Sequence, residues 1–108
     1  MVKEEEIKQI ALKIAQEYNP EKIILFGSFA WGKPNDNSDV DLLIVKNTEN
    51  VHNLAMNIDG FLFPRSFPID LIVYTPEQIK KEIDLEEPFI LKATKQGKIL
   101  FTSNDRRK

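Results

Sequence analysis

The chain has 108 residues, of which 42% are hydrophobic and 30% charged, as in ordinary globular domains. Its formal net charge of −2 argues against general nucleic-acid binding, which needs a basic surface. The sequence has no cysteine, no signal-peptide pattern and no apolar run near the roughly 20 residues of a membrane span. We therefore expect a single domain over residues 1–108, cytoplasmic, without a membrane segment.

Apolar residues recur at helical and strand spacings, and turn-forming residues separate the segments. In chain order the patterns predict a helix at 3–18, a strand at 22–26, a tight helical turn or loop at 29–32, a strand at 40–45, a helix at 49–62, a strand at 69–74, a helix from Thr75 that breaks before Pro88 and resumes to Gln96, and a strand at 98–101. This order predicts an α/β (α+β) fold in which helices cover a mixed sheet of about four strands. The end of the chain, residues 105–108, is expected to be a solvated terminus.

Two aspartates mark the start of the second predicted strand. Side chains alternate along a strand, so Asp39 and Asp41 point to the same face, with Cα atoms about 6.5–7 Å apart. That separation allows both carboxylates to bind one metal ion. Two carboxylates at the start of an apolar strand repel each other and are costly without a cation. Hard divalent ions such as Mg²⁺ prefer oxygen ligands of this kind.

A third aspartate, Asp70, lies in the otherwise apolar segment at 69–74. If the strands at 40–45 and 69–74 are neighbours, three carboxylates converge. Beside a polyphosphate, such a cluster requires metal, and with two Mg²⁺ ions it forms the clamp that catalyses in-line phosphoryl or nucleotidyl transfer.

Gly27-Ser28 stands where the first predicted strand meets a helical turn. Glycine lets the backbone approach a ligand closely, and backbone N–H groups at the start of a helix favour phosphate. Gly-Ser or Asp-x-Asp alone is a common structural pattern. Their combination, with ten residues between Ser28 and Asp39 and with Asp70 in a further strand, is far more specific and predicts a catalytic site.

Other candidates are weaker, because structural explanations account for them as well or better. Trp31 can stack on a nucleobase or a partner, or simply pack. His52, the single histidine of the chain, lies near the start of a predicted surface helix and is expected to be solvated. The Lys80-Lys81 pair is expected to lie on a solvated helix face.

These motifs resemble the minimal nucleotidyltransferases (MNT) of the DNA polymerase β superfamily. The resemblance is carried by Leu25-Phe26-Gly27-Ser28-Phe29-Ala30-Trp31-Gly32 and by Asn37-Ser38-Asp39-Val40-Asp41-Leu42-Leu43-Ile44-Val45. It implies that Gly27 and Ser28 hold the triphosphate of a nucleotide donor and that Asp39 and Asp41 bind two Mg²⁺ ions. Asp70 would be the third carboxylate, which ligates the catalytic metal and assists deprotonation of the acceptor. The family usually has arginine where this chain has Trp31, so the anchoring of the triphosphate is expected to differ.

Small stand-alone members of this family resemble antitoxins that pair with HEPN-type toxins, and some of them adenylylate the toxin on tyrosine. The resemblance therefore implies transfer of AMP from ATP to a HEPN-type partner protein, in a homo- or hetero-oligomer. Two alternatives stay open. One is transfer to a small, aminoglycoside-like acceptor, although such enzymes usually carry an added domain. The other is a non-catalytic antitoxin that acts by binding alone.

Overall fold

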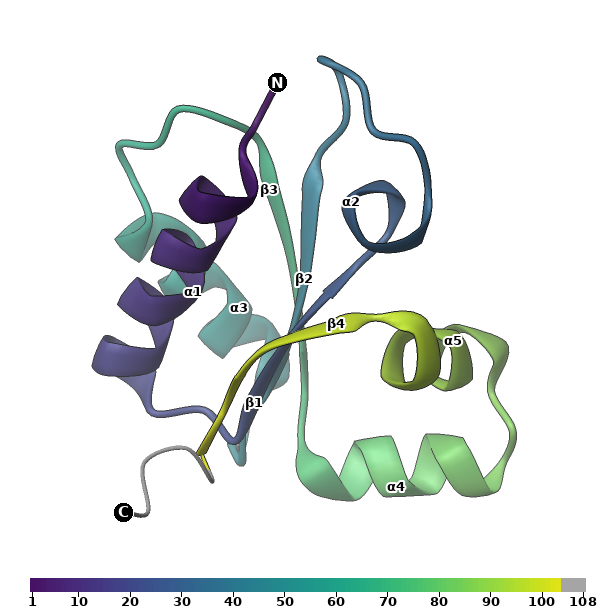
Figure 1. Cartoon of the computed structure of the whole chain (residues 1–108). Helices are drawn as coiled ribbons and strands as arrows, with labels where there is room; N and C mark the ends of the chain where they lie inside the picture. The colour runs from purple at the N-terminus through teal and green to yellow at the C-terminus, as the bar shows by residue number, and fades with distance from the viewer. Residues whose placement is uncertain (104–108) are drawn as a thin grey trace.

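The computed structural model describes residues 1–103, so the expected solvated terminus at 105–108 lies outside the described residues. The elements in chain order are α1 (Glu4–Tyr18), β1 (Lys22–Phe26), α2 (Ser28–Trp31), β2 (Val40–Val45), α3 (Val51–Phe61), β3 (Ile69–Tyr74), α4 (Pro76–Asp84), α5 (Pro88–Gln96) and β4 (Lys98–Thr102). The expected mixed sheet of four strands covered by helices is confirmed (Figure 1).

The four strands form one sheet in the order β3-β2-β1-β4. β1 is central and antiparallel to both β2 and β4, whereas β2 and β3 are parallel and joined through α3. The antiparallel pairing brings the end of β1 to the start of β2, and the parallel pairing sets the start of β3 beside the start of β2. The three segments that carry the predicted site residues, at Gly27-Ser28, at Asp39 and Asp41, and at Asp70, therefore meet at one end of the sheet.

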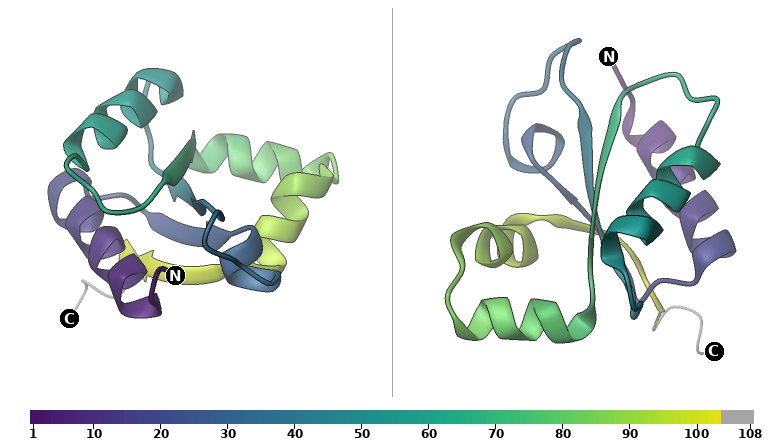
Figure 2. Two further views of the ribbon diagram at one scale, coloured as in Figure 1. Left: turned by 90° about the horizontal axis from the view of Figure 1, so that it is seen from above. Right: turned by 180° about the vertical axis from the view of Figure 1, so that it is seen from behind.

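Helices cover the two faces of the sheet unequally. α1 and α3 lie on one face, and α2, α4 and α5 lie on the other (Figures 1 and 2). The α1/α3 face carries the larger core, to which β2 contributes Val40, Leu42 and Ile44. The α4/α5 face carries a smaller core, to which β2 contributes Leu43 and Val45. β2 is thus buried on both sides along most of its length, as its apolar run predicts.

Local sequence signals explain where the helices begin and end. Three glutamates occupy the first turn of α1, and Asn19 ends it in a left-handed conformation with φ 50°. Thr75 and Gln78 form the expected reciprocal capping box at the start of α4. α3 is two residues shorter at its start than predicted, because Asn50 caps it through the backbone N–H of Asn53. Within residues 1–103, no helix is long and apolar enough to cross a membrane.

Candidate active site

Gly27 makes the turn from β1 into α2. Its φ is +77°, a conformation that residues with a side chain rarely adopt. Its carbonyl accepts hydrogen bonds from the backbone N–H groups of Ala30 and Trp31, at 2.9 and 3.0 Å. These bonds make Ser28–Trp31 a short helix, where the sequence predicted a tight helical turn or a loop at 29–32. The sharp bend places the Gly27-Ser28 backbone at the end of the sheet, over the strand that follows.

Gly27 also lies directly against one of the aspartates. Phe26 is the β1 partner of Asp41 in the antiparallel register, so the next residue, Gly27, passes beside the Asp41 carboxylate. A Cβ atom built on Gly27 would collide with Oδ2 of Asp41. Glycine is therefore required here for two reasons, the positive φ and the space occupied by a carboxylate.

Asp41 and Asp70 are direct partners in the parallel register of β2 and β3. Neighbouring strands lie about 4.8 Å apart, and paired residues point to the same face, so the two carboxylates are side by side. Both belong to the α4/α5 face, since Asp41 alternates with Val40 and Leu42 of the opposite core. Asp39, which is exposed, precedes β2 by one residue. The predicted convergence of strands is present.

The electrostatics of this corner of the sheet disfavour three bare carboxylates. Burial, together with the smaller effects of the charges of Asp70 and Asp39, raises the pKa of Asp41 to about 6. The pKa rise means that the negative form of Asp41 is held at a cost, which a nearby cation would remove. Perturbed acids of this kind are typical of functional sites.

The residues present fit a hard divalent cation. All the candidate ligands are carboxylate oxygens, and Gly27 has no side chain that would displace the carboxylate of Asp41. As the side chains stand, no three His, Cys, Asp or Glu side chains of residues 1–103 surround a single point closely enough to hold one metal ion. Mutual repulsion between like charges favours such separated side chains. The strand register, rather than a closed ligand cage, is what brings the acids together.

Trp31 forms an aromatic cluster on the same face of the sheet. Its ring lies 6.4 Å from that of Phe26, which in turn meets Phe89 of α5 edge to face at 5.1 Å. Nζ of Lys92, also from α5, lies 4.7 Å from the centre of the Trp31 ring. Trp31 therefore has a packing role, and its ring also makes a cation–π contact with Lys92.

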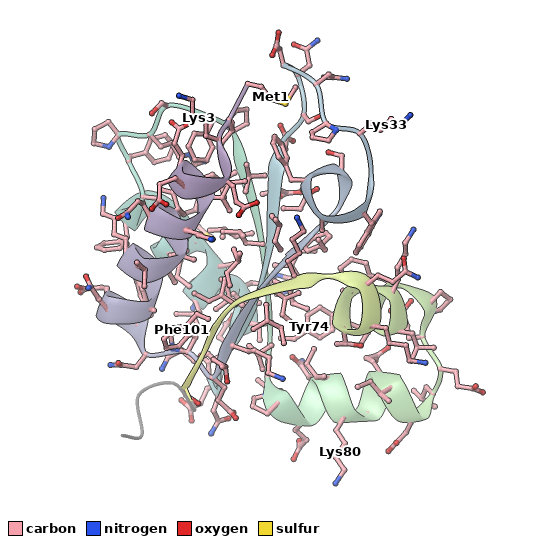
Figure 3. All side chains as sticks on the ribbon, viewed as in Figure 1. Met1, Lys3, Lys33, Tyr74, Lys80 and Phe101 are labelled. Atoms are coloured by element: carbon pink, nitrogen blue, oxygen red, sulfur yellow. The ribbon has the colours of Figure 1, made fainter. Side chains whose placement is uncertain are left out.

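Sequence reasoning did not single out Lys92, which the structure places over Trp31. No local pattern distinguishes it from the other exposed lysines of the chain, and its neighbour Trp31 is far away in sequence. The other side candidates match their expected roles: His52 is exposed at the start of α3, and Lys80 extends from α4 away from the rest of the molecule (Figure 3).

Comparison with known proteins identifies the class to which this fold and site belong. The family model described as polymerase beta, nucleotidyltransferase matches residues 5–106, so the chain belongs to this nucleotidyltransferase family. The resemblance inferred from the motifs is confirmed, and with it the general class of transferase.

Two solved structures are similar to this chain. One, described as a candidate nucleotidyltransferase from Sulfolobus solfataricus, is 25% identical with a TM-score of 0.61, and the match covers 91% of this chain and 78% of the other. The second is the MntA-HpeT toxin-antitoxin structure, in a doubly substituted variant; it is 15% identical with a TM-score of 0.60, covering 92% of this chain and 76% of the other. No curated protein matches the chain.

Proposed function

We propose that this protein transfers AMP from ATP to a hydroxyl group of a partner protein, a HEPN-type toxin, and thereby acts as an antitoxin. The observation that carries the proposal is the register of the sheet, which sets Asp41 beside Asp70 and beneath the Gly27 turn. Family membership supports nucleotidyl transfer as the reaction class. The fold shared with a toxin-antitoxin structure supports the choice of a toxin as acceptor.

Three carboxylates and a turn at Gly27 suit the two sides of such a reaction, the triphosphate and the acceptor. Asp39 and Asp41 would hold Mg²⁺ on the side of the triphosphate, and Asp70 would hold it on the side of the acceptor. Bound Mg²⁺ would neutralise the charge that develops on the phosphate oxygens during displacement. The backbone at Gly27, which has no side chain of its own, and the hydroxyl of Ser28 would contact the triphosphate.

Asp70 is the carboxylate best placed to act on the acceptor. It is exposed on the edge strand β3, whereas Asp41 is partly buried on the interior strand β2. The acceptor oxygen forms a bond to the α-phosphorus, and the bond from that phosphorus to the bridging oxygen breaks, releasing pyrophosphate. The proton of the acceptor hydroxyl passes to the Asp70 carboxylate.

Lys92 supports a polyphosphate as the ligand of this face. The described part of the α4/α5 face presents three acids at the end of the sheet, and a triphosphate would add further negative charge. A lysine held over Trp31, one helical turn beyond Ser28, offers a positive charge on the same side of the molecule. We expect it to contact the phosphates, a role that arginine at position 31 would serve in the usual family pattern.

The proposal is tested by incubating the protein with α-labelled ATP, Mg²⁺ and the product of the neighbouring gene. The wild-type protein should label that product, and Asp41→Asn and Asp70→Asn should each lower labelling by about 10³-fold, the size of effect that loss of several kcal/mol of metal-dependent stabilisation produces. Asp84→Asn, which removes an exposed acid at the end of α4, is the matched control and should label normally.

Two other outcomes would redirect the assignment. Labelling of small hydroxylated compounds but not of the protein partner would favour the small-molecule alternative. Toxin neutralisation that persists unchanged in Asp41→Asn would show that contact is sufficient and that transfer is secondary.

A further inference from the structure

The two edge strands of the sheet differ in how well they are protected against pairing with another strand. β4 begins with Lys98, and its pairing with β1 is interrupted by a shift of register between Ile23 and Ile24. β3 pairs with β2 continuously over six residues, and Asp70 is its one charged residue. Natural proteins usually protect edges with charges, proline or bulges, because a regular apolar edge invites a further strand.

The outer side of β3 presents backbone donors and acceptors. The carbonyl oxygens of Pro68 and Tyr74 accept hydrogen bonds from the β2 segment, so even-numbered residues of β3 direct their backbone groups toward β2. Because these groups alternate along a strand, the N–H and C=O groups of Ile69, Leu71 and Val73 face outward. Within residues 1–103, β3 pairs with β2 alone (Figure 2, right).

A groove runs along this free edge, between β3 and α3. One depression, of about 240 Å³, is lined by Ala55, Met56, Asp59, Ile69, Asp70 and Leu71. A second, of about 190 Å³, shares Ala55 and Leu71 with the first and continues to His52 and Val73. We call the two together the β3 groove. The two depressions adjoin at Ala55 and Leu71, and Asp70 is among the residues that line the first.

One charged residue of the β3 groove is neutralised by an ion pair, and an apolar side chain of the groove is exposed. The carboxylate of Asp59 is paired with Nη1 of Arg65 at 2.9 Å. The Met56 side chain is 72% exposed on the α3 side. Exposed methionine is a flexible apolar contact that adapts to different side chains. Apolar walls beside free backbone groups match a polypeptide better than a sugar or another polar small molecule.

We propose that the β3 groove binds an extended segment of a partner protein as an added strand, and that this segment carries the hydroxyl group that receives the nucleotide. This inference rests on the proposed function and specifies its acceptor. A side chain of the added strand that points to the α4/α5 face lies beside Asp70, since directly paired residues have Cβ atoms about 5 Å apart. Its hydroxyl oxygen bonds to the α-phosphorus, pyrophosphate leaves, and the proton goes to Asp70.

Binding is tested without nucleotide, so that it is independent of catalysis. The probe is a short peptide in which valine and threonine alternate around one tyrosine; the control peptide has proline at every second position and cannot pair as a strand. Titration is followed by amide NMR. The first peptide should shift the amide signals of Ile69, Leu71 and Val73 and slow their hydrogen exchange, whereas the control peptide should not.

Two variants probe the groove separately. Leu71→Pro removes an outward N–H that the β2–β3 ladder does not use, and should abolish these shifts. Met56→Gln replaces an exposed apolar wall by a polar one of similar length, so it keeps the fold and should weaken binding about fivefold. Leu12→Gln, an equally simple change on the exposed side of α1, should leave peptide binding unchanged.

The outcomes are distinct for the two proposals. Absence of shifts at the three amides, or the same shifts with the proline peptide, overturns the β3 groove as an acceptor site. Concentration-dependent shifts at these amides without peptide also overturn it, in favour of pairing between two copies of the chain. Peptide binding at β3 without any labelling by Mg²⁺-ATP leaves the groove standing and contradicts the proposed reaction.

Discussion

The two faces of the sheet differ at the end where the acidic residues lie. On the α1/α3 face the apolar core extends to the first residue of β2, Val40, which is fully buried. On the α4/α5 face the core reaches only as far as Leu43, and Asp41 takes the next position on that face, toward the start of the strand. β2 thus supplies an uninterrupted apolar core to the α1/α3 face, and on the α4/α5 face it contributes to the acidic corner formed by Asp39, Asp41 and Asp70.

This difference teaches where stability and function should separate. Substitutions on the α1/α3 face should lower the free energy of unfolding with little specific effect on transfer. Substitutions at the acidic corner should lower activity, and some of them should raise stability. The predictions that follow test this division, from the largest expected effect to the smallest.

The largest change is expected from the larger core. Leu42 has no exposed surface, and Leu42→Ala should lower the free energy of unfolding by about 3 kcal/mol through lost burial and a residual cavity. Urea denaturation measures the change. Leu12→Ala, on the exposed side of α1, should stay within about 0.5 kcal/mol of the wild type. A small loss at Leu42 would mean that the α1/α3 face does not dominate stability.

The Gly27 turn should be the position where one methyl group affects the acidic corner most. Gly27→Ala must push the Asp41 carboxylate away and adopt a strained positive φ, so we expect transfer to fall about 10²-fold, or roughly 2.7 kcal/mol. Initial rates of labelling measure it.

The control for this change is a glycine in open surroundings. A Cβ atom on Gly60, in α3, meets no other atom within 4 Å. Gly60→Ala should therefore leave the rate unchanged and raise stability by up to about 1 kcal/mol, because alanine is the better helix former. Equal losses of rate in both variants would contradict the close contact between Gly27 and Asp41.

Asp41→Asn should make the metal-free protein more stable. The folded-state pKa of Asp41 is raised to about 6, so between pH 4 and 6 the folded protein holds a proton that the unfolded chain has lost, and stability falls as pH rises. Asparagine removes this loss. At pH 7 we expect a gain of about 1 kcal/mol, after allowance for solvent screening of a partly exposed group.

The control for the higher stability of Asp41→Asn is its dependence on pH and on Mg²⁺. Below pH 4 the variant and the wild type should have the same stability, apart from the neutral substitution itself. Adding Mg²⁺ at pH 7 should stabilise the wild type and not the variant, since a ligand stabilises only the state that binds it. Thermal unfolding across these conditions would refute the idea if Mg²⁺ affected both proteins alike.

The smallest effect is expected at Lys92. Lys92→Met keeps the length of the side chain over Trp31 but removes its charge, so affinity for ATP should fall about threefold to fivefold, or roughly 1 kcal/mol. Trp31 fluorescence during an ATP titration measures it. Lys80→Met, on the far side of α4, should bind ATP as the wild type does; if both variants lose affinity equally, net charge rather than position is responsible.

The sequence predicted most of the fold because each element carries its own local signal. The helices have caps and an apolar stripe, and the strands are short apolar runs between turn residues. The alternation rule also placed Val40 and Leu42 on the face opposite to Asp41 correctly. The loop-or-helix choice at 29–32 depended on hydrogen bonds to the carbonyl of Gly27, which no propensity specifies.

The candidate site was predictable in its residues and not in its contacts. Gly27, Asp41 and Asp70 could be named from spacing, but their meeting required the strand order, and strand order is a tertiary property. Lys92 and the β3 groove have no sequence motif at all. They arise because α5 and α3 pack beside β1 and β3, which brings residues distant in the chain into contact.

The parallel register that pairs Asp41 with Asp70 also acts against misfolding. If β3 slipped by one residue along β2, every side chain of β3 would change faces, and Asp70 would enter the apolar interior beneath α1 and α3. Burying an unpaired carboxylate there costs far more free energy than the hydrogen bonds of the shifted β2–β3 pairing would contribute. Asp70, to which we assign a catalytic role, therefore also disfavours pairing of β3 with β2 in a register shifted by one residue. If an apolar residue replaced it, the native register would be less strongly preferred.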